Sequence, residues 1–172
     1  ALPAAGLING DFETGSLAPW SVSISATSAL PSAAVVGPGP APYTNGNLDQ
    51  VNTGSFSAAL YSGYGGLSHA DFASIEQPVY VDPTTTNLQF NVAAVLNGAH
   101  STTPVEDAYF AIEVLSGGSV VQAIRYYYAS SPAPLVDDGV TDWRHLPWTP
   151  VNLNLAPYTG TTVTLRFSVH DC

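Results

Sequence analysis

Apolar and polar residues alternate along many short segments of the chain. The clearest alternation is at the C-terminal end, where Val163, Leu165, Phe167 and Val169 are separated by single polar residues. A period of two with branched and aromatic side chains predicts a half-buried strand over 162–170. These four side chains are therefore predicted to be buried. The residues between them, which are predicted not to be buried, are Thr164, Arg166 and Ser168.

Similar patterns predict further strands, each bounded by Gly, Pro, Asn or Asp. The Gly117-Gly118 pair between two apolar runs predicts a tight hairpin. No apolar period of 3.6 residues persists long enough to predict more than a short helix. The further strands are predicted at Leu7–Glu13, Trp20–Ser25, Phe56–Tyr61, Ser74–Val81, Leu88–Val92, Tyr109–Leu115, Val120–Tyr128 and Pro150–Leu155. Irregular stretches are predicted at Ser28–Asn47, Ala99–Asp107 and Ala129–Asp142.

Many short strands with frequent turns indicate an all-β sandwich or barrel. The length of 172 residues fits one domain, and residues 1–172 are treated as a single domain because the strand pattern continues on both sides of each irregular stretch. The net charge of −10 with only three Lys and Arg residues argues against a nucleic-acid partner. No apolar run is long enough for a membrane span.

Several motifs follow one another along the chain. The stretch Leu7 to Gly15 (LINGDFETG) followed by Trp20-Ser-Val-Ser is similar to the opening of extracellular jelly-roll domains of the carbohydrate-binding-module type. Phe56-Ser-Ala-Ala-Leu and Ile75-Glu-Gln-Pro-Val are similar to two of their later strands, and the run from Trp148 to Phe167 to their last part. The resemblance implies a jelly-roll β-sandwich of two antiparallel sheets, located outside the cell or on its surface.

The same resemblance implies one more strand beyond Asp171, which would close a sheet beside the N-terminal strand. The prediction is therefore an incomplete sandwich that lacks its closing strand and is completed by another one. Either the sequence is a piece of a longer chain, or a neighbouring subunit inserts an extended segment, for which Ala1–Gly6 is the first candidate. In the second case the contact would run head to tail and could build a filament.

Asp11 and Glu13 are the predicted metal ligands. The resemblance places them in a stretch that helps to hold a structural calcium ion, and Ca²⁺ prefers carboxylate oxygens. On a regular strand both side chains would point to one face. The alternative is two solvated acids at a strand end. Asp137-Asp138-Gly139 is interpreted as a solvated turn rather than a metal loop, because its spacing does not match that of an EF-hand.

Aromatic side chains are the candidates for binding a sugar ring, whose C–H face packs on an aromatic plane. Trp20 and Trp148 fit core positions by alternation. The predicted glycan-stacking residues are Tyr127, Trp143, Tyr64 and Tyr61, chosen from a wider set that includes Tyr43, Tyr126 and Tyr128.

The sequence shows no constellation of catalytic residues. The four histidines, His69, His100, His145 and His170, are not accompanied by a nucleophile-elbow, zincin or paired-cysteine motif. His170 and Cys172 share a strand face and could contribute to a zinc site only with ligands from another chain. The chain is therefore predicted not to be an enzyme.

Two functions follow. The first is a non-catalytic extracellular module that recognises a glycan or surface polymer. The alternative is a structural or adhesive subunit of a cell-surface filament or sheath, which binds copies of itself by strand donation. The low content of charged residues, 9%, and the expected missing strand favour the second, and the length of the resemblance favours the first.

Overall fold

Strands form almost all of the regular structure in a computed structural model of the chain. The structure describes residues 6–25, 32–62, 71–84, 86–98 and 107–171. The strands in this part are β1 (Ser21–Ile24), β2 (Ser32–Val36), β3 (Ser57–Tyr61), β4 (Phe72–Tyr80), β5 (Asn87–Asn97), β6 (Tyr109–Ser116), β7 (Ser119–Tyr127), β8 (Val136–Asp137), β9 (Trp143–Asn154) and β10 (Thr162–His170). A 3₁₀ helix, η1 (Ala156–Tyr158), connects β9 to β10.

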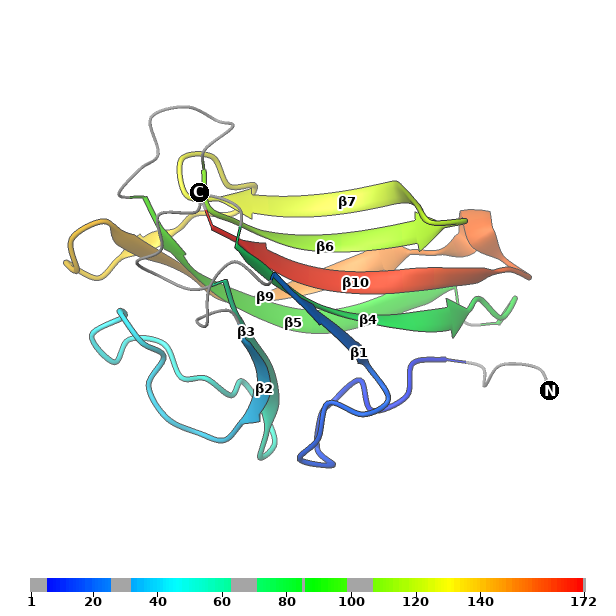
Figure 1. The fold of residues 1–172 in the computed structure, drawn as a ribbon, viewed down its shortest axis with the longest axis horizontal. Helices are drawn as coiled ribbons and strands as arrows, with labels where there is room; N and C mark the ends of the chain where they lie inside the picture. Colours follow the sequence, from blue (N-terminus) through cyan, green and yellow to red (C-terminus); the bar gives the residue numbers. More distant parts are fainter. Residues whose placement is uncertain (1–5, 26–31, 63–70, 85, 99–106, 172) are drawn as a thin grey trace.

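The strands lie in two layers (Figure 1). One layer is a five-stranded antiparallel sheet in the order β1-β4-β10-β6-β7. The other layer consists of two separate antiparallel sheets, β5-β9-β8 and β2-β3. The long ladders β5–β9 and β4–β10–β6 pack face to face across the core. This arrangement confirms the predicted all-β jelly-roll sandwich of antiparallel sheets.

The core lies between the layers and consists of alternate residues of the facing strands. Its largest fully buried side chains include Ile75, Ile112, Leu146, Leu153 and Leu165. The alternation of β10 is confirmed for Val163 and Leu165, which are buried.

The prediction for the rest of β10 was only partly correct. Phe167 and Val169 point to the core side but are only half-buried. Ser168, predicted not to be buried, is buried. Its small side chain lies in the central strand of the sheet, where the ring of His170 approaches its hydroxyl at 3.2 Å between Nε2 and Oγ.

The strand predicted at Leu7–Glu13 is not present. Asn9 and Phe12 have positive φ angles of 50° and 59°, which end any extended backbone there. The segment is instead held by side chains. Gln77 of β4 accepts a hydrogen bond from the backbone N–H of Ile8 at 2.7 Å and donates one to its carbonyl at 2.9 Å. Trp20, buried as predicted, donates from Nε1 to the carbonyl of Asn9 at 3.1 Å.

Two short strands and the true length of β9 were missed. β2 and β8 lie within stretches that were predicted to be irregular, and β9 begins at Trp143, well before the predicted Pro150. The register of β5 against β9 shifts between Val92 and Ala94, where Pro147 and Trp148 of β9 lie opposite Ala93 of β5. Because a bulge interrupts the alternation of faces, Trp148 does not occupy the core position predicted for it and is half-buried.

Candidate functional site

A stacked pair of aromatic rings lies where the β2–β3 connection meets the start of β9. The rings of Tyr43 and Trp143 have centroids 4.0 Å apart and an interplanar angle of 4°. Trp143 is half-buried, while Tyr43 is 48% exposed. The pair therefore presents the ring of Tyr43 to solvent with a second ring directly behind it. Tyr43 and Trp143 are called the aromatic platform below.

The strand geometry places Trp143 beside an amide side chain. Trp143 is the first residue of β9, and its Cα partner in β5 is Asn97. Directly opposed residues of an antiparallel pair project to the same face of the sheet. The backbone N–H of Trp143 donates to the carbonyl of Val140 at 3.0 Å, and Gly98 donates to the carbonyl of Asp142 at 2.8 Å. These turns determine where β9 begins and so fix the position of its first ring.

Hydrogen bonds between residues of the loop that carries Tyr43 determine its conformation. Tyr43 itself has a φ of 62°, an uncommon backbone conformation for a residue other than glycine. Thr44 is fully buried and donates from its hydroxyl to the carbonyl of Ala41 at 2.7 Å. Ala41 also pairs with Leu48 through a backbone hydrogen bond of 2.8 Å. The loop is thus folded back on itself around a buried threonine.

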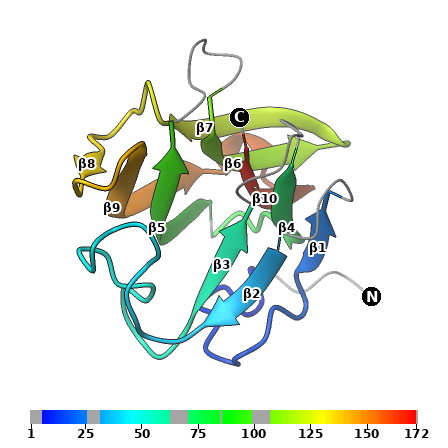
Figure 2. The same cartoon turned by 60° about the vertical axis from the view of Figure 1, so that its left-hand side comes forward.

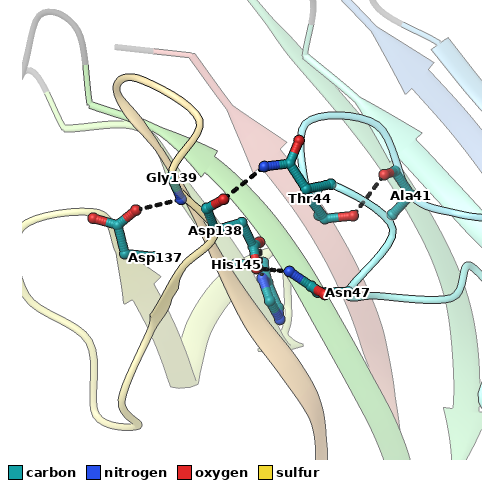
Figure 3. Close-up of polar contacts among 8 residues, drawn as sticks. Ala41, Thr44, Asn47, Asp137, Asp138, Gly139 and His145 are labelled. Carbon is teal, nitrogen blue, oxygen red and sulfur yellow. Dashed lines mark hydrogen bonds and ion pairs between the residues drawn. The ribbon is translucent and has the colours of Figure 1, made fainter.

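Asp138 attaches this loop to β9 (Figure 3). Its carboxylate accepts hydrogen bonds from Asn47 Nδ2, at 2.8 Å, and from His145 Nδ1. Its backbone carbonyl accepts a third from Asn45 Nδ2 at 2.7 Å. The side chains of Asp138 and His145 are only 2% and 3% exposed. We call Asp138, His145, Asn45 and Asn47 the Asp138 clamp.

The neighbouring Asp137 behaves differently. It is exposed and accepts a hydrogen bond from the backbone N–H of Gly139 at 2.8 Å, as expected in a turn (Figure 3). The interpretation of Asp137-Asp138-Gly139 as a solvated turn is therefore correct for Asp137 and wrong for Asp138. The sequence gives no sign of the difference, because the two asparagine partners of Asp138 are about 90 residues away in the chain.

Trp148 lies near the same loop. Its Nε1 donates to the backbone carbonyl of Asp49 at 2.9 Å. The carboxylate of Asp49 accepts from the backbone N–H groups of Val51 at 3.0 Å and Gly39 at 3.2 Å. These hydrogen bonds, above all the one from Val51, lower the pKa of Asp49 and keep it ionised. The loop is thus held to β9 at Asp49 as well as through the Asp138 clamp.

A groove with a volume of about 960 Å³ lies next to the platform. It is lined by β3 on one side and β5 on the other, and Tyr61, Trp143 and Trp148 contribute to its walls. Of the predicted glycan-stacking residues, Tyr61 and Trp143 therefore share one concave region. Tyr64 lies outside the described residues. Tyr43, which belonged to the wider set of candidates, is the most exposed aromatic residue at this groove.

Tyr127 lies on a different surface. Its ring is the last in a row that crosses the outer face of the five-stranded sheet. The neighbouring centroids are 5.2 Å apart for Tyr127 and Tyr109, 4.4 Å for Tyr109 and His170, and 5.8 Å for His170 and Phe72. Each pair is also a pair of Cα partners in adjacent strands. The structure therefore does not bring Tyr127 together with Trp143.

Ion pairs accompany this row on the same face. Arg125 Nη2 lies 2.7 Å from Glu113 Oε1, and Arg166 bridges Glu76 at 3.1 Å and Glu113 at 3.5 Å. The hydrogen bond to Glu113 raises the pKa of Arg125. These pairs hold two of the three arginines of the chain, so this face is tied together by charge as well as by ring packing.

His170 is a member of the row whose surroundings favour the neutral imidazole. Burial lowers its pKa, and the nearby Arg125 and Arg166 act in the same direction against the opposing effect of Glu113. Burial likewise raises the pKa of Tyr109. Within the described residues no three His, Cys, Asp or Glu side chains gather as a metal site. His69, His100, Glu106 and Cys172 lie outside the described part.

Glu13 has a structural role that the sequence did not predict. Its carboxylate accepts hydrogen bonds from the backbone N–H groups of Ser55, at 2.9 and 3.1 Å, and Phe56, at 3.1 Å. Asp11 accepts one from the N–H of Glu13 at 3.3 Å. Because the segment is not a strand, the argument that both acids share a strand face does not hold. Glu13 already has its charge balanced by N–H dipoles, and the described residues supply no third acid, so the fit to calcium is poor. Calcium binding by this pair stays a prediction.

Comparisons with known proteins agree with the fold. The structure of the carbohydrate-binding module TmCBM61 in complex with β-1,4-galactotriose is similar to this chain, with a TM-score of 0.53 and 15% sequence identity over 97% of this chain and 88% of that chain. No protein-family model and no curated protein sequence matches the chain. In the described residues no helix is long and apolar enough to cross a membrane.

Proposed function

We propose that this chain is a non-catalytic, extracellular module that binds a neutral glycan by stacking a sugar ring on Tyr43. The observation that carries the proposal is the aromatic platform, an exposed tyrosine ring stacked at 4.0 Å on Trp143. The similarity to a carbohydrate-binding module supports it at the level of the fold. A sugar stacked on such a ring is stabilised both by burial of apolar surface and by the electrostatic attraction between its C–H groups and the face of the ring.

The rigidity of the platform favours binding. A side chain that is already held in its bound position loses little conformational freedom when a ligand arrives. Tyr43 is held by the ring of Trp143 and by a loop that the Asp138 clamp attaches to β9. Polar groups beside an aromatic ring can supply hydrogen bonds to sugar hydroxyls, and the loop that carries Tyr43 is rich in them.

The charge of the chain restricts the class of glycan. With a net charge of −10, the surface repels acidic polysaccharides at low ionic strength. Neutral hexose polymers carry no such penalty. We therefore expect β-1,4-galactan and other neutral glycans to bind better than polygalacturonate, and the neighbour's ligand makes β-1,4-galactotriose the first probe.

The acid of the clamp is not placed for catalysis on a bound sugar. Hydrolysis of a glycosidic bond normally requires two carboxyl groups on opposite sides of the sugar. Asp138, the acid of the clamp, is buried and directs its oxygens to His145 and Asn47 rather than outward. It therefore positions the platform and is not presented to a ligand.

Titration calorimetry of the purified chain with β-1,4-galactotriose and a panel of neutral oligosaccharides tests the proposal. We expect Tyr43→Ala to weaken binding about tenfold or more, equivalent to ~1.4 kcal/mol, and Tyr43→Phe to retain most of it because the ring remains. Tyr127→Ala is the matched control, since it removes a half-buried tyrosine from the other surface.

Two results would contradict the proposal. Absence of binding to every neutral glycan of the panel would remove the function. Loss of binding in Tyr127→Ala, with Tyr43→Ala unaffected, would move the site to the outer face of the five-stranded sheet. The alternative function, a filament subunit assembled by strand donation, stays a prediction. The groove between β3 and β5 is also relevant to that alternative.

A further inference from the structure

The second layer of the sandwich is divided by a groove. β3 forms a ladder with β2, and β5 forms a ladder with β9. No ladder joins β3 to β5 within the described residues, and the groove of about 960 Å³ is lined by both strands. Figure 2 shows β3 and β5 pointing in the same direction on the two sides of this division.

The floor of the groove consists of core side chains that are not fully covered. Phe90 of β5 and Phe167 of β10 pack edge to face with centroids 5.1 Å apart, and both line the groove. Both are only half-buried although they lie on the core side of their strands. Leu60, Leu88 and Val169 line the same groove and are half-buried too. The predicted burial of β10 therefore fails at the residues beneath the groove.

The two strands that border the groove each have one edge without a ladder in the described part of the chain. An unpaired strand edge presents N–H and C=O groups that need partners. Since β3 and β5 run in the same direction, one strand between them can be antiparallel to both. Such a strand would join β2-β3 and β5-β9-β8 into one continuous sheet.

We propose that the groove between β3 and β5 is a binding site for one extended polypeptide segment, antiparallel to both strands and with apolar side chains at alternate positions. Backbone hydrogen bonds on both sides supply affinity, and the alternate apolar side chains cover Phe90 and Phe167. A glycan lacks a regular row of N–H and C=O groups to pair with the backbone of the two strand edges, and its hydroxyls do not cover the apolar floor. The proposal rests on β3 and β5 and is independent of glycan binding at Tyr43.

The position of the last described residues guides the experiment. Val169, His170 and Asp171 line the groove together with Tyr61 and Asn97, which are the last residues of β3 and β5. A segment tethered at this end would therefore run antiparallel to both strands. Tethering also gives a weakly binding peptide an effective concentration of roughly millimolar.

The probe is a synthetic peptide of alternating valine and threonine, about nine residues long, which is within the usual range of strand lengths. One sample receives the free peptide, and another carries the same sequence fused after Cys172 through a flexible Gly-Ser linker. The matched control is the same peptide N-methylated at alternate amides, which preserves side chains but removes donors. Residue-resolved hydrogen exchange and thermal melting are the measurements.

We expect the free and the fused peptide to slow amide exchange about tenfold or more in β3 and β5 and to raise the Tm, while β7, the edge of the other sheet, is unchanged. The N-methylated peptide should do neither. Equal protection by the N-methylated peptide, or no protection even in the fusion, would overturn the proposal.

Two further outcomes assign the groove to another occupant and also overturn it. Protection of β3 and β5 by β-1,4-galactotriose in place of the peptide would make the groove a glycan site. Protection that grows with protein concentration in the absence of peptide would assign it to a second folded copy. Tyr43→Ala separates the two proposals, because it should weaken glycan binding about tenfold or more, whereas peptide protection of β3 and β5 should persist, since their backbone groups are unchanged.

Discussion

Replacement of Asp138 by alanine is the sharpest test of how the loop of Tyr43 is held. The substitution removes both carboxylate hydrogen bonds of the clamp, from Asn47 Nδ2 and from His145 Nδ1. His145 is then a nearly fully buried ring whose donor lacks its partner. The bond from Asn45 to the backbone carbonyl of residue 138 is unaffected.

The expected cost follows from the burial of each partner. The hydrogen bond from the exposed Asn47 is worth about 0.5–1.5 kcal/mol, and an unpaired buried donor such as His145 Nδ1 costs about 1–3 kcal/mol. Asp138→Ala should therefore lower the free energy of unfolding by roughly 2–4 kcal/mol, which for a domain of this size corresponds to about 4–16 °C in Tm. Affinity for glycan should fall as well, because the loop loses its attachment to β9.

Asp137→Ala is the matched control for this measurement. It removes an adjacent aspartate with the same charge and one exposed hydrogen bond, to the N–H of Gly139. We expect a loss of about 1 kcal/mol or less. The double replacement Asp138→Leu with His145→Phe should be less destabilising than Asp138→Ala, since no buried polar group is left unpaired. Urea unfolding that gives equal losses for the two single alanine variants would refute the clamp.

Three further predictions concern packing, protonation and metal. Leu165→Ala should cost about 2–5 kcal/mol. Phe167→Ala should cost less than the ~3–5 kcal/mol of a fully buried phenylalanine, because Phe167 lies under the groove; a loss for Phe167→Ala within or above that range in urea unfolding would contradict this. Burial lowers the pKa of His170 below 6.5, so the unfolded chain binds more protons than the folded chain just below pH 6.5, and the free energy of unfolding should fall as the pH decreases through 6.5. His170→Phe should flatten this part of the plot of unfolding free energy against pH, and an unchanged plot would count against the prediction. If Asp11 and Glu13 bind calcium, a chelator should lower the Tm of the wild type and leave Glu13→Gln unaffected, whereas identical melts with and without chelator would exclude calcium.

Local alternation carries most of the information about the fold. The positions of β3, β4, β6, β7 and β10 agree with the sequence pattern within a few residues. Gly117 and Gly118, with φ angles of 58° and 83°, form the predicted hairpin between β6 and β7. These features depend on neighbours in the chain, and for that reason the pattern of one segment is sufficient to predict them.

The errors occur where a segment depends on distant partners. Leu7–Glu13 alternates like a strand, but Gln77 and Trp20 hold it in an irregular path. β2 is a strand because β3 pairs with it, and Trp148 leaves the core because of a bulge that the β5–β9 register introduces. Each outcome follows from hydrogen bonds between residues far apart in the sequence.

The candidate site shows the same division. The sequence pattern identified aromatic side chains as candidates and, by assigning Trp20 and Trp148 to the core, selected Trp143 among the tryptophans. Only the tertiary structure places Tyr43 on Trp143 and separates both from Tyr127, since the three come from a loop and from strands in different sheets. Asp138 looks the same as Asp137 in the sequence. Its role is decided by burial against His145 and by asparagines of the β2–β3 connection, contacts that exist only once the layers have packed.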